Sequence, residues 1–322
     1  MDEATVIERF FWHLGAVRTD VVLGIGDDAA LLRPPPGFDL AMTTDSLVEN
    51  VHFLHGSPPR SLGHRALAVN LSDLAAMGAT PAWALLSLTL PAIDEAWLGD
   101  FSTGFGRLAR EQNVTLAGGN LSRGPLNITV QLAGHVVVNT ALRRSGAHEG
   151  DEIWVSGTLG DAALGRQISP GADEGAASRW LHDRFEYPTP RVALGGALRG
   201  VASACIDLSD GLLADLPRLA AASHCGAVLD LDRLPLSDAL KAEAGRTEPG
   251  EAAWQRALIG GEDYELCFTA PPAAAPALAA IAERCDVPLT RCGRMRQTAG
   301  LELRNAGAVI QFSHSPFGHF SP

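Results

Sequence analysis

Short acidic stretches flanked by Gly, Ser or Thr recur along this chain, and they are the residues best suited to chemistry. GIGDDAA begins at Gly24, TTDS at Thr43 and DLSDG at Asp207. Carboxylate and hydroxyl oxygens are the ligands that Mg²⁺ prefers. Each stretch alone is also compatible with a turn or a helix cap, because Asp and Ser bond to nearby backbone groups. The recurrence favours convergence around bound cations, since carboxylates that face one another otherwise repel.

Asp73 carries the strongest physical argument for a metal. It lies in a helix predicted over residues 61–78, which is apolar on nearly every side after Ala66 and is therefore expected to be buried. A buried Asp is nearly always paired or metal-bound. Asn70 shares its helix face, three residues earlier. Arg65 is the alternative, as an ion-pair partner two turns away, and we favour the metal.

Two further stretches join glycines to polar residues. GGNLSRG, from Gly118, is predicted to be a loop after a strand over 114–118, and GGEDYEL, from Gly260, to precede a strand. Consecutive glycines allow backbone amides to approach a phosphate closely. A plain turn is the alternative. The TTDS stretch is predicted at the end of a strand over 39–43, and all these stretches are expected at strand or helix ends.

The lysine content excludes several ways of binding ATP. Lys241 is the only lysine, and its surroundings, DALKAE, carry no motif. A Walker A loop and a protein kinase both need a lysine at a fixed place, and a Schiff-base enzyme needs an amine. If the chain binds ATP, it must therefore hold the phosphates with metal ions, backbone amides and arginines.

Composition sets broader limits. The chain has 322 residues, 46% of them hydrophobic and 19% charged, as expected for a globular protein of about two domains. The net charge of −12 argues against a nucleic-acid partner. No apolar run is long enough for a membrane span, and the N-terminus does not resemble a signal peptide. The five cysteines are scattered, which predicts a reducing, cytoplasmic location.

The order of predicted elements indicates a mixed α/β (α+β) fold in two domains. We expect a domain over residues 1–141, which pairs its sheet in a dimer and binds ATP and Mg²⁺. A second domain over 142–322 is expected to have a mixed sheet and to add phosphate, metal and substrate contacts. Helices are predicted at 5–14, 61–78, 94–112, 158–168, 175–184, 190–200, 211–224 and 273–284. Strands are predicted at 21–24, 29–33, 39–43, 83–90, 114–118, 126–138, 152–155, 204–208, 227–231, 264–269, 287–292 and 300–304.

The motifs GIGDDAA, TTDSLVENVHF, NLSDLAAMGA, GGNLSRGP, RRSGA, DLSDGLLADL and GGEDYELCF occur in this order. Together they closely resemble the thiamine-monophosphate kinase family, from about Leu23 to the C-terminus. The resemblance implies direct in-line transfer of a phosphoryl group from ATP to thiamine monophosphate, with several Mg²⁺ ions. It also implies a homodimer whose N-terminal domains join through their sheets.

The resemblance assigns roles by motif position. The implied Mg²⁺ ligands are Asp28, Thr43, Thr44, Asp45, Asp73, Asn120, Asp207 and Asp210, of which the five Asp residues are the implied catalytic set. ATP or its phosphates would be contacted by Gly119, Asn120, Arg144 and Ser209, and the substrate by His52, Glu262 and Phe317. Asn120 departs from the pattern, because many relatives carry Asp there. A neutral ligand thus replaces one expected carboxylate.

Other functions remain open from the sequence. The superfamily also includes aminoimidazole ribonucleotide synthetase, which spacing alone does not exclude. Selenophosphate synthetases usually have a reactive Cys or selenocysteine with a nearby Lys in an N-terminal Gly-rich loop, and this chain has no Cys before Cys205. Hydrogenase-maturation relatives end in a Cys tail, whereas this chain ends HFSP. A non-catalytic Mg-nucleotide-binding protein and a metal-dependent phosphatase are alternatives of other classes.

Overall fold

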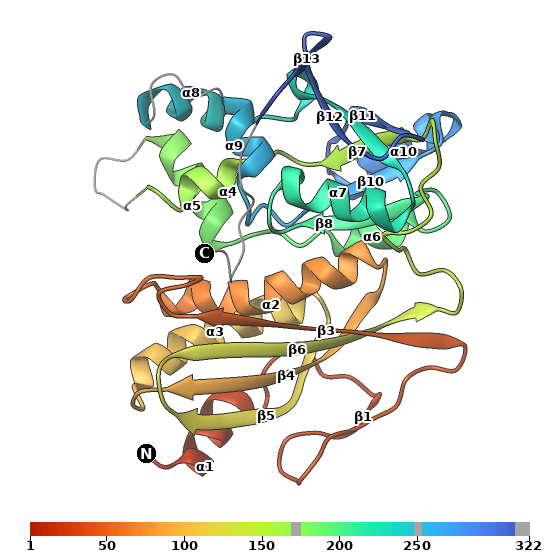
Figure 1. The fold of residues 1–322 in the computed structure, drawn as a ribbon. Helices are drawn as coiled ribbons and strands as arrows, with labels where there is room; N and C mark the ends of the chain where they lie inside the picture. The colour runs from red at the N-terminus through yellow and green to blue at the C-terminus, as the bar shows by residue number, and fades with distance from the viewer. Residues whose placement is uncertain (169–174, 248–252, 313–322) are drawn as a thin grey trace. The chain divides into compact units, whose positions relative to one another are not determined.

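A computed structural model describes residues 1–168, 175–247 and 253–312 of the chain. The chain divides into two compact units. Unit 1 consists of residues 1–74 and 79–139, and unit 2 of residues 75–78 and 140–322. Each unit is built around its own sheet, with helices packed on it (Figure 1).

The sheet of unit 1 has four strands in the order β3-β6-β4-β5. Strand β3 (Phe38–Val48) pairs antiparallel with β6 (Asn127–Val137), and β6 pairs antiparallel with β4 (Thr80–Leu90). Strand β5 (Thr115–Arg123) lies parallel to β4. Helices α2 (Pro59–Ala76) and α3 (Glu95–Glu111) lie along one face of this sheet (Figure 1).

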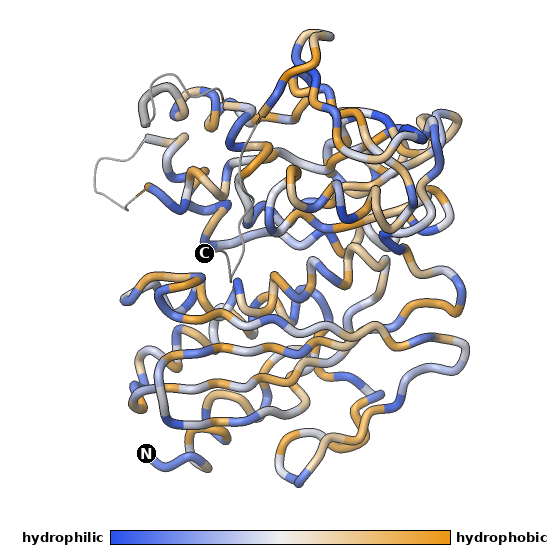
Figure 2. Tube along the Cα trace, in the orientation of Figure 1, coloured by the Kyte–Doolittle hydropathy of each residue, from blue (hydrophilic) through white to orange (hydrophobic). Residues whose placement is uncertain are grey.

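Close packing of α2 and α3 depends on a glycine. A Cβ at Gly104 of α3 would lie 1.8 Å from the carbonyl oxygen of Arg60 in α2, so only Gly allows the two backbones to meet. From Ser61 onward helix α2 is buried on nearly every side, as predicted from its apolar sequence, but Asp73 is partly exposed, so its predicted burial was wrong. Hydrophobic and hydrophilic segments alternate along the strands of the sheet (Figure 2), as expected for strands with two different faces.

The N-terminal part of unit 1 departs from one predicted helix over 5–14. A short α-helix, α1 (Glu3–Val6), continues as a π-helical turn, η1 (Ile7–Phe11). Two short strands follow, β1 (Val21–Leu23) and β2 (Leu31–Leu32), which pair antiparallel.

Two predicted strand ends were wrong. The TTDS stretch lies inside β3, and GGNLSR lies inside β5 rather than in a loop after it. Pairing extends both strands: Thr43 to Ser46 are matched residue by residue with β6, and Gly118 to Arg123 with β4. Gly119 pairs with Leu86 of β4, and this pairing requires glycine because a Cβ there would lie 1.9 Å from the carbonyl oxygen of Leu86.

Unit 2 has a mixed sheet of seven strands in the order β13-β12-β9-β11-β7-β10-β8. Its strands are β7 (Glu152–Ser156), β8 (Ala204–Leu208), β9 (Gly226–Asp230), β10 (Glu265–Ala270), β11 (Leu289–Arg296), β12 (Gly300–Asn305) and β13 (Ala308–Ile310). Its helices are α4 (Asp161–Gly165), α5 (Ala176–Glu186), α6 (Val192–Leu198), α7 (Leu212–Ala222), α8 (Asp238–Thr247), α9 (Ala253–Ile259) and α10 (Ala275–Cys285), with 3₁₀ turns η2 (Leu231–Arg233) and η3 (Pro272–Ala274).

Alternation along β8 and β10 sorts the core of unit 2 into two layers. Ile206 and Leu208 pack in one hydrophobic cluster with Leu212, Leu216 and Leu219 of α7. Cys205, Leu266 and Phe268 belong to a second cluster, with apolar residues of α6 and α10. The side chain of Asp207 therefore points to the same side as Cys205, opposite to α7.

The sequence did not reveal α8, α9 or β13, and the helix predicted over 158–168 is only the short α4. These elements lie near segments of weak periodicity. Within the described residues, no helix is long and apolar enough to cross a membrane.

Candidate functional site

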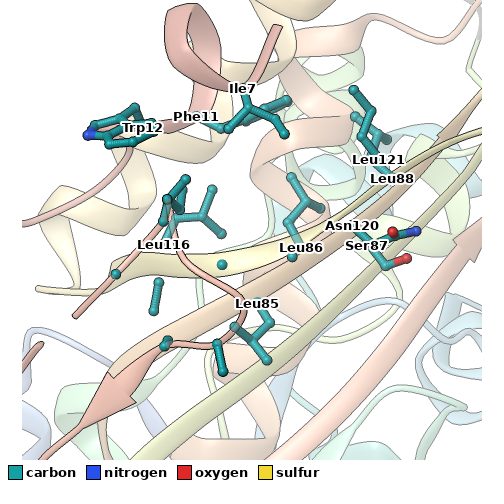
Figure 3. A pocket seen from close by; sticks show the side chains of 18 of the residues that line it. Ile7, Phe11, Trp12, Leu85, Leu86, Ser87, Leu88, Leu116, Asn120 and Leu121 are labelled. Atoms are coloured by element: carbon teal, nitrogen blue, oxygen red, sulfur yellow. The ribbon is translucent and has the colours of Figure 1, made fainter. Parts of the chain in front are cut away.

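A cavity of about 950 Å³ lies in unit 1, lined by the N-terminal segment and by β4 and β5, and consecutive residues such as Leu86 and Ser87 both line it. Its apolar wall includes Ile7, Phe11 and Trp12 of the N-terminal segment, together with Leu86 and Leu116 (Figure 3). Its polar lining consists mainly of residues from the acidic and glycine-rich stretches: Asp27, Asp28, Thr44, Ser87, Gly118, Gly119, Asn120, Thr129 and Gln131. A cavity with a large apolar wall and a few convergent polar groups is the usual form of a small-molecule site.

Strand register explains why these polar groups meet. Ser46 pairs with Thr129, Thr129 with Ser87, and Ser87 with Asn120, so one row crosses the sheet. The hydroxyls of Ser46 and Thr129 lie 2.7 Å apart in a hydrogen bond, and Asn120 lies beside Ser87 (Figure 3). In the next row, Thr44 pairs with Gln131, and Leu85 pairs with both Gln131 and Gly118. Distant segments are thus joined by sheet pairing.

Asp28 reaches the cavity from the segment between β1 and β2. It is exposed, and its backbone N–H donates to the Asp27 carboxylate at 2.8 Å. This is the local Asp-to-backbone hydrogen bond expected of a turn. It fixes the backbone here while leaving the Asp28 side chain at the cavity wall.

Thr43 and Asp45 lie on the opposite face of the sheet from Thr44, because alternate residues of β3 point to opposite sides. The hydroxyl of Thr43 donates to Oδ2 of Asp73 on α2, at 2.5 Å. The structure therefore brings together Thr43 and Asp73 in one place and Asp28, Thr44, Gly119 and Asn120 in another. Sequence adjacency of Thr43 and Thr44 concealed this separation.

Helix α2 and the loop after β3 are joined by polar contacts. Arg65 is completely buried and donates to the carbonyl oxygen of His52 at 3.3 Å. The backbone N–H of Val48 donates to Nδ1 of His52 at 3.0 Å, which orients the imidazole ring. Asn70 is completely buried too, and its amide donates to the Ala66 carbonyl within the helix. The amide nitrogen of Asn70 is thus hydrogen-bonded to its own helix, one turn before it and away from Asp73.

The residues fit a magnesium ion in donor chemistry. The Thr43 hydroxyl beside the Asp73 carboxylate is a pair of hard-oxygen donors of the type that Mg²⁺ prefers. Among the residues that the structure describes, however, no group of three or more His, Cys, Asp or Glu side chains is close enough to hold a metal ion. The acidic stretches thus provide pairs of hard-oxygen donors on separate faces.

In unit 2 the DLSDG and GGEDYEL stretches lie against each other. Ser209 accepts a backbone hydrogen bond from Glu262 at 2.9 Å, and Leu208 accepts one from Tyr264 at 2.9 Å. A Cβ at Gly261 would lie 2.5 Å from the Ser209 carbonyl oxygen, so this approach requires glycine. Glu262 and Tyr264 both have positive φ, at 69° and 51°. Such strain in non-glycine residues is concentrated at functional sites.

Asp210 is held by residues of α7. Its backbone N–H donates to Oδ2 of Asp215 at 3.0 Å, and Arg218 donates through Nη1 to Oδ2 of Asp210 at 2.6 Å and to Oδ1 of Asp215 at 2.7 Å. Asp215 is almost fully buried, and burial raises its pKa to about 6, although the hydrogen bond from Asp210 acts against this shift.

Buried charges also support the Glu262 loop. Glu265 is fully buried, and it accepts hydrogen bonds from Ser156, Arg184 and Arg191. Asp263 accepts from the backbone N–H of Gly160 at 2.8 Å. Burial raises the pKa of Asp263 to about 8, against the opposing effects of that hydrogen bond and of Arg184.

Arg144 contacts the end of α7 that is opposite to Asp210. Its carbonyl accepts a hydrogen bond from Ser223, which follows the C-terminal end of α7, whereas Asp210 precedes the N-terminal end. Asp207, on the buried strand β8, lies close to the turn that contains Ser209 and Asp210. Phe317 lies outside the described residues.

Sequence reasoning missed the supporting residues. Several neighbours support the loops that carry the predicted site residues: Asp215, Arg218, Asp263 and Glu265. Trp12 forms a wall of the cavity. The spacing of Asp215 and Arg218, three residues apart on a helix, was a usable signal. The partners of Asp263 and Glu265 lie more than 70 residues away in the chain, so no local signal exists for them.

Two domain families match the chain in succession. AIR synthase related protein, N-terminal domain, matches residues 26–138, and AIR synthase related protein, C-terminal domain, matches residues 148–304. The fold and its two domains therefore define a protein of the AIR synthase related class.

Curated relatives narrow this class. The thiamine-monophosphate kinase of Escherichia coli (strain K12) is 46% identical over 323 residues, covering 99% of this chain and 98% of the relative. That of Salmonella typhimurium is 45% identical at the same coverage. A crystal structure of thiamine-monophosphate kinase from Stenotrophomonas maltophilia K279a has a TM-score of 0.84 and 45% identity, covering 90% of this chain and 93% of its own. This chain belongs to the thiamine-monophosphate kinase family.

Another solved structure, AaThiL complexed with AMPPCP and TMP, has a TM-score of 0.77 and 33% identity and covers 89% of each chain. Structures of the hydrogenase maturation protein HypE share the fold at about 20% identity. At this identity, these structures show a shared fold and nothing more.

Proposed function

We propose that this chain transfers the γ-phosphoryl group of ATP directly to thiamine monophosphate, giving thiamine diphosphate and ADP. The observation that carries the proposal is the match, at 45–46% identity over 99% of the chain, to relatives named thiamine-monophosphate kinase. The binding of an ATP analogue and TMP by AaThiL supports the same two substrates. This reading replaces the alternatives of a synthetase, a phosphatase or a non-catalytic binding protein.

The cavity of unit 1 suits a nucleotide. Its apolar wall at Phe11 and Trp12 can pack against a purine ring, and its polar lining can receive phosphates and their cations. Gly119 brings backbone without a side chain to this lining, as phosphate binding by amides requires. Because the motifs contain no lysine, we propose that backbone amides, cations and arginine bind the phosphates.

The acceptor needs little activation, because a phosphate monoester oxygen is already nucleophilic. The main obstacle is repulsion between two anionic phosphates, so catalysis rests on positioning and charge neutralisation. When bound, Mg²⁺ ions supply the neutralising charge. Their proposed ligands are Asp28, Thr43, Thr44, Asp45, Asp73, Asn120, Asp207 and Asp210. Arg144 and Ser209 are proposed for the ATP phosphates, and His52 and Glu262 for the substrate; the hydrogen bond from Val48 keeps His52 in one orientation.

We also propose a homodimer in which the sheets of unit 1 pair. Strand β3 is an edge of its sheet, and its residues Phe38, Leu40 and Met42 are exposed on the side of Thr44. Exposed apolar side chains on an open edge strand favour association. As the division of work, we propose that residues 1–141 bind ATP and Mg²⁺ and pair in the dimer, and that residues 142–322 add phosphate, metal and substrate contacts.

A cytoplasmic location is part of the proposal. All five cysteines lie in the described part of the chain and are free thiols. Burial raises the pKa of Cys205 and Cys292, so these thiols are inert packing groups that need no disulfide. This agrees with a reducing compartment.

The proposal is tested by mixing the chain with Mg-ATP and thiamine monophosphate and measuring both ADP and thiamine diphosphate. Formation of the two products in equal amounts, dependent on both substrates, is expected. Release of inorganic phosphate from thiamine monophosphate without ATP would identify a phosphatase. Tight ATP binding without turnover would identify a nucleotide-binding protein, and either result would overturn the proposal.

A further inference from the structure

Asp210 has a support that its predicted role alone does not explain. It precedes α7, whose N-cap is Gly211 and makes no side-chain cap. The carboxylate of Asp215, from the first turns of α7, instead reaches back to the backbone N–H of Asp210. A helix that only needed a cap would be served by an exposed Ser or Asp at the cap position. Here an almost fully buried carboxylate contacts the residue before the cap.

Arg218 connects the two carboxylates through one nitrogen atom. Its Nη1 donates to Oδ2 of Asp210 and to Oδ1 of Asp215. Because Asp215 is fixed by burial, the guanidinium is fixed relative to α7, and Asp210 cannot rotate without losing its contact. The contact uses Oδ2 and leaves Oδ1 of Asp210 outside it. The positive charge also reduces repulsion between the two neighbouring acids.

We propose that Asp215 and Arg218 are positioning residues for Asp210, and that they hold its carboxylate ready for a divalent cation that accompanies the phosphates. The inference rests on the proposed function, in which Asp210 is a metal ligand. Residues that hydrogen-bond to a metal-binding carboxylate set its orientation and charge, and their loss typically costs about 10- to 100-fold in metal affinity or activity.

The experiment compares Arg218→Met, Arg218→Lys and Asp215→Asn with the unchanged chain. Mn²⁺ binding is titrated by electron paramagnetic resonance with a non-hydrolysable ATP analogue, and kcat and KM for Mg-ATP are measured over a range of Mg²⁺ concentrations. For Arg218→Met we expect about tenfold weaker binding of one Mn²⁺ ion and about a tenfold higher Mg²⁺ requirement. Arg218→Lys should recover part of this loss, because the charge is kept.

Arg233→Met is the matched control. Arg233 has a similar exposure, 48% against 46% for Arg218, and lies 4.0 Å from Asp230 in the same unit. A thermal melt of each variant separates positioning from folding. If Arg218→Met matches Arg233→Met in Mn²⁺ binding and Mg²⁺ requirement, the proposal is overturned. The same holds if its losses simply follow reduced stability.

A double-mutant cycle isolates the pair. The effects of Arg218→Met and Asp215→Asn on Mn²⁺ binding should be less than additive, since both act through Asp210; full additivity would contradict the proposal. The binding measurement also separates this inference from the proposed function. If the chain without substitutions makes no thiamine diphosphate, the proposed function is refuted. The Mn²⁺ titration of the variants still decides whether Asp215 and Arg218 support a cation site.

Discussion

The acidic stretches of the two units are positioned by different means. In unit 1, Thr43 and Thr44 lie within a paired strand, and strand alternation sends them to opposite faces of the sheet. In unit 2, Ser209 and Asp210 lie in a turn, where contacts with Gly261 and with α7 fix them. The first arrangement takes its precision from sheet register. The second relies on contacts with side chains of α7, because a turn has no ladder of strand hydrogen bonds to hold it.

Because of this difference, we expect some substitutions to affect the reaction and others to affect the stability of the fold. Asp73 is partly exposed and bonded to a hydroxyl, so we expect that replacing it removes a proposed metal ligand with little structural cost. Glu265 is buried between two arginines, so replacing it unbalances the interior. Substitutions in the two units should therefore fail in different ways, as the following predictions state from the largest effect to the smallest.

Asp73→Asn should lower kcat/KM by about 100-fold or more at saturating Mg²⁺, because it removes charge stabilisation at the phosphates. Its melting temperature should change little. Steady-state kinetics and a thermal melt measure both, with Asp100→Asn on the surface of α3 as the control. Near-normal turnover would show that Asp73 holds no catalytic metal.

Glu265→Gln should destabilise unit 2 by about 3 kcal/mol or more, because it leaves Arg184 and Arg191 buried without their carboxylate. Denaturant unfolding measures this loss. Glu152→Gln, which removes a partly exposed ion pair with Arg291, should cost less than about 1 kcal/mol. Equal costs for the two variants would contradict the structural role given to the buried Glu265 ion pairs.

Met42→Glu should convert the proposed dimer to monomers, since it places a charge on the exposed apolar part of β3. Sedimentation velocity reports the change. Val309→Glu, at an equally exposed position of unit 2, should leave the dimer intact. A dimer that survives Met42→Glu would exclude this surface as the interface.

Asp263→Asn should change how stability depends on pH. The pKa of Asp263 is raised by burial to about 8 in the folded chain, above its usual 3.8. The folded state therefore holds a proton that the unfolded state releases, so this group's contribution is full below about pH 4 and falls as pH rises towards 8. The slope is about 1.4 kcal/mol per pH unit at most.

Denaturant unfolding at several pH values tests this sign. The free energy of unfolding of the unchanged chain should decrease, relative to Asp263→Asn, between pH 4 and pH 8. A difference that stays constant over this range would mean that Asp263 is ionised throughout.

Asn120→Asp should have the smallest effect, a few-fold decrease in the Mg²⁺ concentration for half-maximal activity. A carboxylate there would add an anionic ligand at the cavity lining, to which Asn120 belongs. Ser122→Asp, two residues along the same strand, is the control. An unchanged or increased Mg²⁺ requirement would separate Asn120 from the metal site.

Much of the fold follows from local pattern. The buried helix around Asp73, the strands of unit 2 and the class of fold could be predicted, because apolar periodicity depends on nearby residues. The ends of β3 and β5 could not, since their pairing partners in β6 and β4 extended them beyond the predicted ends. The short α8 and α9 lacked a strong period.

The order of the acidic motifs in the sequence by itself determined the family, and with it the chemistry to be expected of Asp28, Asp73 and Asp210. Only the tertiary structure decided which of them meet. It separated Thr43 from Thr44, brought Thr44 and Asn120 to the lining of one cavity, and placed Arg218 on Asp210. The reason is physical: residue types fix which ligands are available, whereas sheet register and contacts between distant side chains fix where those ligands point.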